Sequence, residues 1–185
     1  MKTRMIIVAA PSGAGKSSFV EKLTRENLRL KDIITFTTRS MRKGESEGNP
    51  YHYIESADFQ HKVQTGFFVE WAKVHTNYYG TSYESLESAW AEGRTAIMDI
   101  DIQGVATFKA KYPDAKTIFI LPPSIEELRR RIERRDGGIP ADIEVRMTNA
   151  EKEIQEASKF DFQIVNDQFD QSYAEFKKIV EELLG

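Results

Sequence analysis

The sequence has no cysteine, so disulfide bonds and thiolate metal sites are excluded. It also has no apolar run near the roughly 20 residues that a membrane-spanning helix needs, and it leads into an apolar strand without a signal-peptide pattern. An excess of positive charge is missing too, because the formal net charge is −3. We therefore expect a cytoplasmic protein that binds neither membranes nor nucleic acid.

Apolar runs that alternate with helical patterns indicate the fold class. At 185 residues and 40% hydrophobic composition, the chain is long enough for one substantial core. Runs typical of buried parallel strands lie at 5–9, 96–100, 117–121 and 162–165. Helical patterns lie at 85–90, 103–111, 124–135, 141–159 and 171–184. This alternation predicts an α/β fold with a parallel sheet flanked by helices on both faces, and ligands at the carboxyl ends of its strands.

The clearest motif is a phosphate-binding loop at residues 10–17, APSGAGKS, between the first apolar run and a helical pattern that begins near Lys16. Ala10 replaces the first glycine of the usual signature, but the strand before and the helix after are the context that the motif requires. Gly13 and Gly15 allow a tight turn, and N–H groups at the helix start attract an anion. Lys16 would reach the β- and γ-phosphates; the alternative is a turn with a surface lysine.

Two segments interrupt the alternation of strands and helices. Residues 33–83 hold short strand-like pieces at 33–38, 51–54 and 67–74, which predict a small inserted mixed β lobe. Residues 126–146 combine the basic run 128–135, LRRRIERR, with a Gly-Gly pair and predict a mobile, helical basic lid. The predicted P-loop core is the rest of the chain, residues 1–32, 84–125 and 147–185.

A carboxylate near the end of the second apolar run suits a metal role. Asp99 fits the magnesium-facing acid of a phosphotransferase, with the Ser17 hydroxyl and phosphate oxygens as further ligands. An aspartate at a strand end more often caps the next helix, but its combination with Lys16 and Ser17 favours the metal role.

Two arginines three residues apart, Arg39 and Arg42, precede Tyr51 in a polar turn. They could converge on one phosphate, because guanidinium groups match phosphate geometry and a phenol adds a hydrogen bond. Arginine pairs in solvated turns are common, so their spacing alone leaves both interpretations open.

Several separated motifs, in order, resemble those of the guanylate kinases. They are TTR-x-x-R-x-GE-x-x-G-x-x-Y at 37–51, EWA at 70–72, NYYGT at 77–81 and DID-x-QG at 99–104. The resemblance extends from the phosphate loop to IVND at 164–167 and so covers essentially the whole chain. It implies a magnesium-dependent kinase that transfers the γ-phosphoryl group of ATP to GMP, and also to dGMP, with the 33–83 lobe binding GMP.

By family position, the resemblance implies a set of site residues. The catalytic residues would be Lys16, Arg39, Arg131 and Arg146. ATP would bind to Ser12, Gly13, Ala14, Gly15, Lys16, Ser17, Ser18, Arg135 and Asn166. GMP would bind to Thr35, Arg39, Arg42, Tyr51, Glu70, Tyr79, Thr81 and Asp101, and magnesium to Ser17 and Asp99.

The implied guanine site is chemically coherent. Guanine offers N1–H and its 2-amino group as adjacent donors, and the Glu70 carboxylate can accept from both. Adenine lacks this pair, so AMP would leave a desolvated carboxylate unpaired, and discrimination could reach roughly 10⁴-fold. Without the resemblance, Glu70 would be taken for a surface residue of a half-buried strand.

The chain departs from the family pattern in places: Met41 replaces a proline, Arg134-Arg135-Asp136 replaces Gly-Arg-Gly in the lid, and Thr35 replaces a serine. Two other functions are compatible with parts of this pattern. One is a catalytically inactive guanylate-kinase-like module that binds phosphopeptides, and the other is a kinase for a ribose bisphosphate. The phosphate loop and Asp99 disfavour the first, and Glu70 disfavours the second. The sequence leaves open whether the protein is a monomer or a homodimer.

Overall fold

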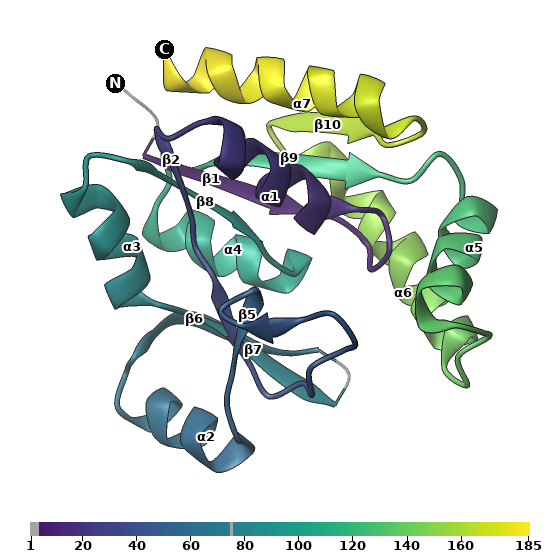
Figure 1. The fold of residues 1–185 in the computed structure, drawn as a ribbon, viewed down its shortest axis with the longest axis horizontal. Coiled ribbons are helices and arrows are strands. Elements are labelled where there is room, and N and C mark those ends of the chain that lie inside the picture. The colour runs from purple at the N-terminus through teal and green to yellow at the C-terminus, as the bar shows by residue number, and fades with distance from the viewer. Residues whose placement is uncertain (1–3, 75) are drawn as a thin grey trace.

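A five-stranded parallel sheet forms the centre of the core (Figure 1). The structure is a computed structural model that describes residues 4–74 and 76–185; residues 1–3 of the predicted core and residue 75 of the predicted lobe lie outside the described residues. The strand order is β10-β9-β1-β8-β2. The bounds are β1 Met5–Ala9, β2 Leu30–Asp32, β8 Thr95–Asp99, β9 Lys116–Leu121 and β10 Phe162–Val165. Because β1 lies between β8 and β9, the loop after β1 begins where such sheets bind ligands.

Helices cover both faces of this sheet, as the sequence predicts. Side chains alternate along β1, so Ile6 and Val8 enter one hydrophobic cluster while Ile7 enters the other. The first cluster includes Phe19 of α1, and the second includes Phe108 of α4. The bounds are α1 Lys16–Glu26, α3 Tyr83–Ala91, α4 Ile102–Lys111 and α7 Phe169–Leu184. The predicted fold class is therefore confirmed.

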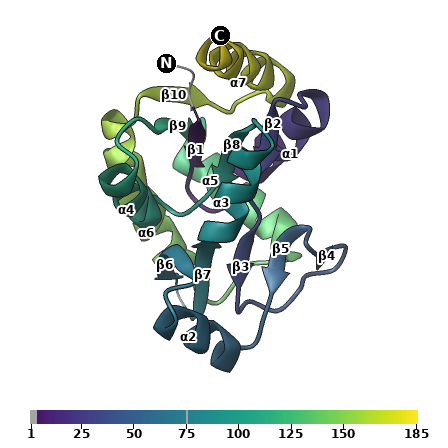
Figure 2. The ribbon, with the colours of Figure 1, turned by 90° about the vertical axis from the view of Figure 1, so that its left-hand side faces the viewer.

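A second five-stranded sheet, of mixed direction, forms the lobe at the opposite end of the molecule from α7 (Figures 1 and 2). Its strand order is β4-β5-β3-β7-β6. The bounds are β3 Thr35–Thr37, β4 Ser46–Glu47, β5 Pro50–Tyr53, β6 Phe68–Val74 and β7 Asn77–Ser82, with α2 at Ser56–Gln64. Phe59 of α2 is fully buried and stacks on Phe68 and Tyr78, so α2 covers one side of the lobe.

Two helices carry the lid segment and the return to the core. These are α5 Ile125–Asp136 and α6 Ile143–Gln155, and a 3-10 turn at Glu156–Lys159 follows α6. The Ser124 hydroxyl accepts a hydrogen bond from Glu127 N–H at 3.1 Å and caps α5. At the other end, Gly137 adopts φ 73°, a left-handed conformation that glycine tolerates, and terminates the helix. No helix among the described residues is long and apolar enough to cross a membrane.

Some elements differ from the sequence prediction. Strand β2 is not predicted, because only Leu30 of its three residues is apolar and fully buried. Helix α2 and strand β7 also lie where the sequence predicts no such element. The predicted helix at 141–159 is shorter, since regular helix ends at Gln155 and the last turn tightens.

Candidate active site

The phosphate loop of residues 10–17 joins β1 to the N-terminus of α1. Gly13 and Gly15 have φ values of 92° and 99°, which residues with a side chain rarely adopt. Helix α1 has no acidic residue in its first turn and no side-chain cap at Gly15. Its first N–H groups and its dipole are therefore available to an external anion.

Ser17 and Lys16 meet the end of β8 beneath this loop. The Ser17 hydroxyl donates to Asp99 Oδ2 at 2.6 Å, and Lys16 Nζ lies 3.9 Å from the same oxygen. Asp99 thus contacts the loop and does not cap the next helix. The capping residue is Asp101, whose Oδ1 accepts from Gln103 N–H at 3.0 Å. A hydroxyl and a carboxylate this close form a pair of hard oxygen donors.

Asn166 follows β10 and supports the loop from below. Its Nδ2 donates to the Ala14 carbonyl at 2.8 Å, and a Cβ on Gly15 would lie 2.7 Å from that nitrogen. The buried Oδ1 has no hydrogen-bond partner among the described residues. One end of this amide therefore positions the loop, and the other end can accept a hydrogen bond from a ligand.

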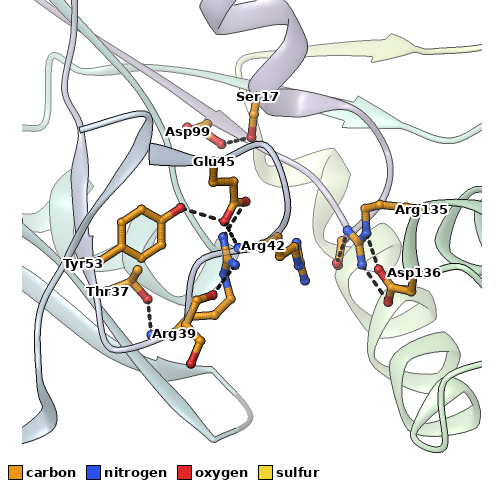
Figure 3. Close-up of polar contacts among 11 residues, drawn as sticks. Ser17, Thr37, Arg39, Arg42, Glu45, Tyr53, Asp99, Arg135 and Asp136 are labelled. Atoms are coloured by element: carbon orange, nitrogen blue, oxygen red, sulfur yellow. Dashed lines mark hydrogen bonds and ion pairs between the residues drawn. The ribbon is translucent and has the colours of Figure 1, made fainter. Parts of the chain in front are cut away.

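A cluster of arginines and tyrosines of the lobe lines the same cavity as the phosphate loop, and Figure 3 shows the two arginines, Arg39 and Arg42. Arg39 Nη2 donates to Glu45 Oε1 at 2.8 Å, and its guanidinium carbon lies 5.3 Å from the Tyr51 ring centre. Tyr51 packs edge-on against Tyr79 at 5.7 Å. Burial, and then the guanidinium groups of Arg135 and Arg39, lower the pKa of Arg42. Cations gathered this closely favour a bound anion.

Glu45 organises this cluster, a role that the sequence does not reveal. Besides Arg39, it accepts from Arg42 N–H at 2.7 Å and from the Tyr53 hydroxyl at 2.8 Å, both at Oε2 (Figure 3). Burial opposes its ionisation, but the hydrogen bonds from Arg39, Arg42 and Tyr53 outweigh burial and lower the pKa to about 2. Glu45 is therefore a permanent anion that holds the Arg39 guanidinium and the backbone of Arg42.

A largely buried carboxylate, Glu70, lies deeper in the lobe. Phe68 pairs with Ser82, yet Glu70 pairs with Thr81, so Val69 is the extra residue of a β-bulge that re-aims the strand. Glu70 is 6% exposed, and burial, followed by the Asp101 carboxylate, raises its pKa to about 7. The buried Thr81 Oγ1 has no hydrogen-bond partner among the described residues. Thr35 is also buried and lines the same space.

The lid supplies three more arginines to the same space. Arg131 Nε donates to Glu127 at 3.1 Å and its Nη2 to the Asp167 carbonyl at 3.5 Å. Arg135 Nη1 lies 3.4 Å from Ser12 Oγ, so this lid arginine contacts the phosphate loop (Figure 3). Asp136 accepts from Arg135 Nε at 2.8 Å and, in addition, from Arg146 Nη1 at 3.0 Å.

One cavity of about 720 Å³ is lined by the phosphate loop, by the arginines, tyrosines and Glu70 of the lobe, and by the arginines of the lid. Every residue predicted for the site lines it except Ala14 and Thr81, which are fully buried. Glu153 of α6 also lines the cavity and was not predicted, because nothing in the sequence distinguishes it from other helical glutamates. Burial, and then Asp101, raise the pKa of Glu153 to about 7.

Comparison with known proteins gives a consistent result. A family model described as guanylate kinase matches residues 2–183. The chain is 77% identical, over the full length of both sequences, to a guanylate kinase of Bdellovibrio bacteriovorus. It is 43% identical to a guanylate kinase of Vibrio cholerae, over 97% of this chain and 87% of that one. The crystal structure of guanylate kinase from Anaplasma phagocytophilum superposes with a TM-score of 0.82 at 28% identity, covering 99% of this chain and 87% of that chain.

Proposed function

This chain belongs to the guanylate kinase family, and from that premise we propose that it transfers the γ-phosphoryl group of ATP to GMP or dGMP, giving ADP and the nucleoside diphosphate. One observation carries the proposal: a single cavity joins the phosphate loop, the arginines of the lobe and lid, and the buried acid Glu70. The cavity therefore offers two anion sites and one site for a hydrogen-bond donor pair. The contacts among Lys16, Ser17 and Asp99 favour this enzyme over the non-catalytic module.

We assign the GMP site to the lobe. Arg39, Arg42, Tyr51 and Tyr79 bind the 5′-phosphate, and Glu70 accepts from guanine N1–H and the 2-amino group. Thr35, Thr81 and Asp101 complete the guanine site. Thr81 lies outside the cavity lining but pairs with Glu70 in the β6–β7 register. Its buried hydroxyl has no partner among the described residues, which supports this assignment because such atoms are uncommon and costly.

We assign ATP to the phosphate loop and the lid. Residues 12–18 bind the phosphates, with Lys16 at the β- and γ-positions, and Arg131, Arg135 and Arg146 face them from the lid. Asn166 lies on the adenine side. A GMP phosphate oxygen attacks the γ-phosphorus in line as the bond to the ADP oxygen breaks, with no covalent enzyme intermediate. Lys16, Arg39, Arg131 and Arg146 offset the charge repulsion between the two substrates and stabilise the charge that develops in transfer.

The oxygen pair of Ser17 and Asp99 fits a magnesium ion brought with ATP. Among the described residues no group of three or more acidic or histidine side chains could hold a metal alone, so phosphate and water oxygens would complete its shell. When bound, magnesium would neutralise part of the phosphate charge.

We also propose the division into a core of residues 1–32, 84–125 and 147–185, a GMP-binding lobe of 33–83 and a lid of 126–146. The two smaller parts contribute arginines from different walls of the cavity, so their closure would exclude water and limit ATP hydrolysis.

A coupled ADP-release assay tests the proposal. ATP and magnesium are offered with GMP, dGMP, AMP, UMP or no acceptor to the wild type, to Glu70→Gln, and to Glu84→Gln as a control at an exposed site on α3. We expect turnover with GMP and dGMP, and a fall in kcat/KM for GMP of about 10²-fold or more in Glu70→Gln only. Folded wild-type protein without turnover on any acceptor would contradict the proposal, and equal rates with AMP would contradict the role of Glu70.

A further inference from the structure

The Glu70 carboxylate rests against a position that has no side chain. Gly104 lies in the first turn of α4 and is buried. A Cβ placed on Gly104 would lie 2.6 Å from Oε2, 2.9 Å from Cδ and 3.3 Å from Oε1 of Glu70. The whole carboxyl group therefore occupies the space that any other residue at position 104 would need.

The backbone does not require glycine at this position. Gly104 has a helical conformation within α4 and is not among the glycines with positive φ. A glycine inside a helix costs about 1 kcal/mol relative to alanine, so the helix alone favours a side chain here. The close approach of Glu70 is the feature of this site that accounts for the glycine.

Helix α4 cannot easily withdraw from Glu70. Val105 and Phe108 anchor it in the core beneath the sheet, and both are buried. Lys111 Nζ, near its C-terminus, donates to the Val69 carbonyl and ties the helix to β6. A methyl group added at position 104 would therefore displace the flexible end of Glu70, and not the backbone of either element.

We propose that Gly104 is a positioning residue for guanine selection. Because it has no side chain, it leaves room for the Glu70 carboxylate in the position that binds guanine. This inference rests on the proposed guanine-binding role of Glu70. Because carbon–oxygen contacts lie at about 3.3–3.6 Å, an added methyl would push Oε2 away by about 0.7 Å or more. Two parallel hydrogen bonds to guanine need both carboxyl oxygens in register, and a misplacement near 1 Å can cost about 10²-fold.

Gly104→Ala, made in the wild type and in Glu70→Ala, tests this role. Thr107→Ala, at an exposed position of the same helix, controls for helix propensity. The measurements are KM for GMP, KM for ATP, kcat and Tm. We expect Gly104→Ala to raise KM for GMP about tenfold or more, with KM for ATP within about twofold and a Tm no lower than that of Thr107→Ala. In Glu70→Ala the same change should alter KM for GMP by less than about twofold, because the displaced group is gone.

Four results would overturn the inference. An unchanged KM for GMP in Gly104→Ala would show that the carboxylate has room to spare. Equal losses in both backgrounds, or a variant that fails to fold, would show that the glycine serves the backbone. If Glu70→Ala alone leaves KM for GMP unchanged, the proposed role of Glu70 fails and the inference fails with it, which separates the two cases.

Discussion

Replacing Glu45 by glutamine should weaken GMP binding, although Glu45 is not among the residues proposed to bind substrate. Its carboxylate accepts from Arg39 at 2.8 Å, Arg42 N–H at 2.7 Å and the Tyr53 hydroxyl at 2.8 Å (Figure 3). The side chains of Arg39 and Glu45 are only 11% and 16% exposed, so solvent screens their ion pair weakly. Glu45→Gln keeps the shape of the group but removes its charge and turns a donor toward its neighbours.

The magnitude follows from these contacts. A hydrogen bond to a charged group contributes about 1.5–3 kcal/mol, so we expect a stability loss of about 2 kcal/mol and a fall in Tm of about 4–8 °C. Release of the Arg39 guanidinium should raise KM for GMP about tenfold, because a mobile arginine loses entropy on binding phosphate. Since the pKa of Glu45 is lowered to about 2, its stabilisation is present above its ordinary pKa and is lost only as pH falls toward 2. The effect should therefore be constant between pH 6 and 9.

Steady-state kinetics with GMP varied at saturating ATP, together with thermal unfolding, measure both effects. Glu47→Gln is the matched control, since Glu47 lies two residues away in β4 and its side chain is 57% exposed. It pairs with His52 at 2.8 Å and accepts from Tyr53 N–H at 3.0 Å, but within the described part of the chain it bonds to neither arginine. An unchanged KM for GMP in Glu45→Gln, alongside lowered stability, would refute the positioning argument. So would equal effects of the two substitutions.

Three further predictions concern single ionisable groups. Lys16→Met should lower turnover at least about 10²-fold without changing Tm or circular dichroism, because a charged transition-state contact is lost, and near-normal turnover would exclude this role. The pKa of Glu70 is raised to about 7 by burial and Asp101, so KM for GMP should rise about tenfold from pH 8 to pH 6 as the carboxylate is protonated. In Glu70→Gln, KM for GMP should change with pH only through the titration of the GMP phosphate itself. Burial and Asp101 also raise the pKa of Glu153 to about 7, so ionisation of Glu153 destabilises the fold as pH rises from the ordinary pKa of glutamate through 7. In denaturant unfolding, Glu153→Gln should therefore stabilise the protein by about 1–2 kcal/mol at pH 8 and by far less at pH 5.

Much of the core was predictable because its signals are local. Strand β1 and the loop after it are each encoded by consecutive residues, and the burial of β1 follows from its run of five apolar residues. Strand β2 was missed because it is a short edge strand with one buried apolar residue, and pairing with β8 rather than propensity makes it a strand.

The site residues likewise fall into those with a local sequence signal and those whose contacts form only in the folded protein. Asp99 follows from strand position and motif, whereas Glu45 and Asp136 act through contacts that only folding creates. Asp136 accepts from arginines one and ten residues away, and no spacing rule predicts the second contact. Gly104 lies within a quoted motif, yet its contact with Glu70 depends on how α4 packs against β6. Ion pairs and close contacts between elements distant in the sequence depend on the tertiary structure, so the sequence alone does not predict them.

The fate of the transferred phosphoryl group tests the central claim most directly. Wild-type protein is incubated with ATP labelled at the γ-phosphate, magnesium and either GMP or AMP, and the products are separated by chromatography. We predict that the label appears in the β-phosphate of GDP, with AMP labelled more slowly by roughly 10⁴-fold. Label found in inorganic phosphate alone, or transferred equally to AMP, would contradict the proposed phosphotransfer and its guanine selection.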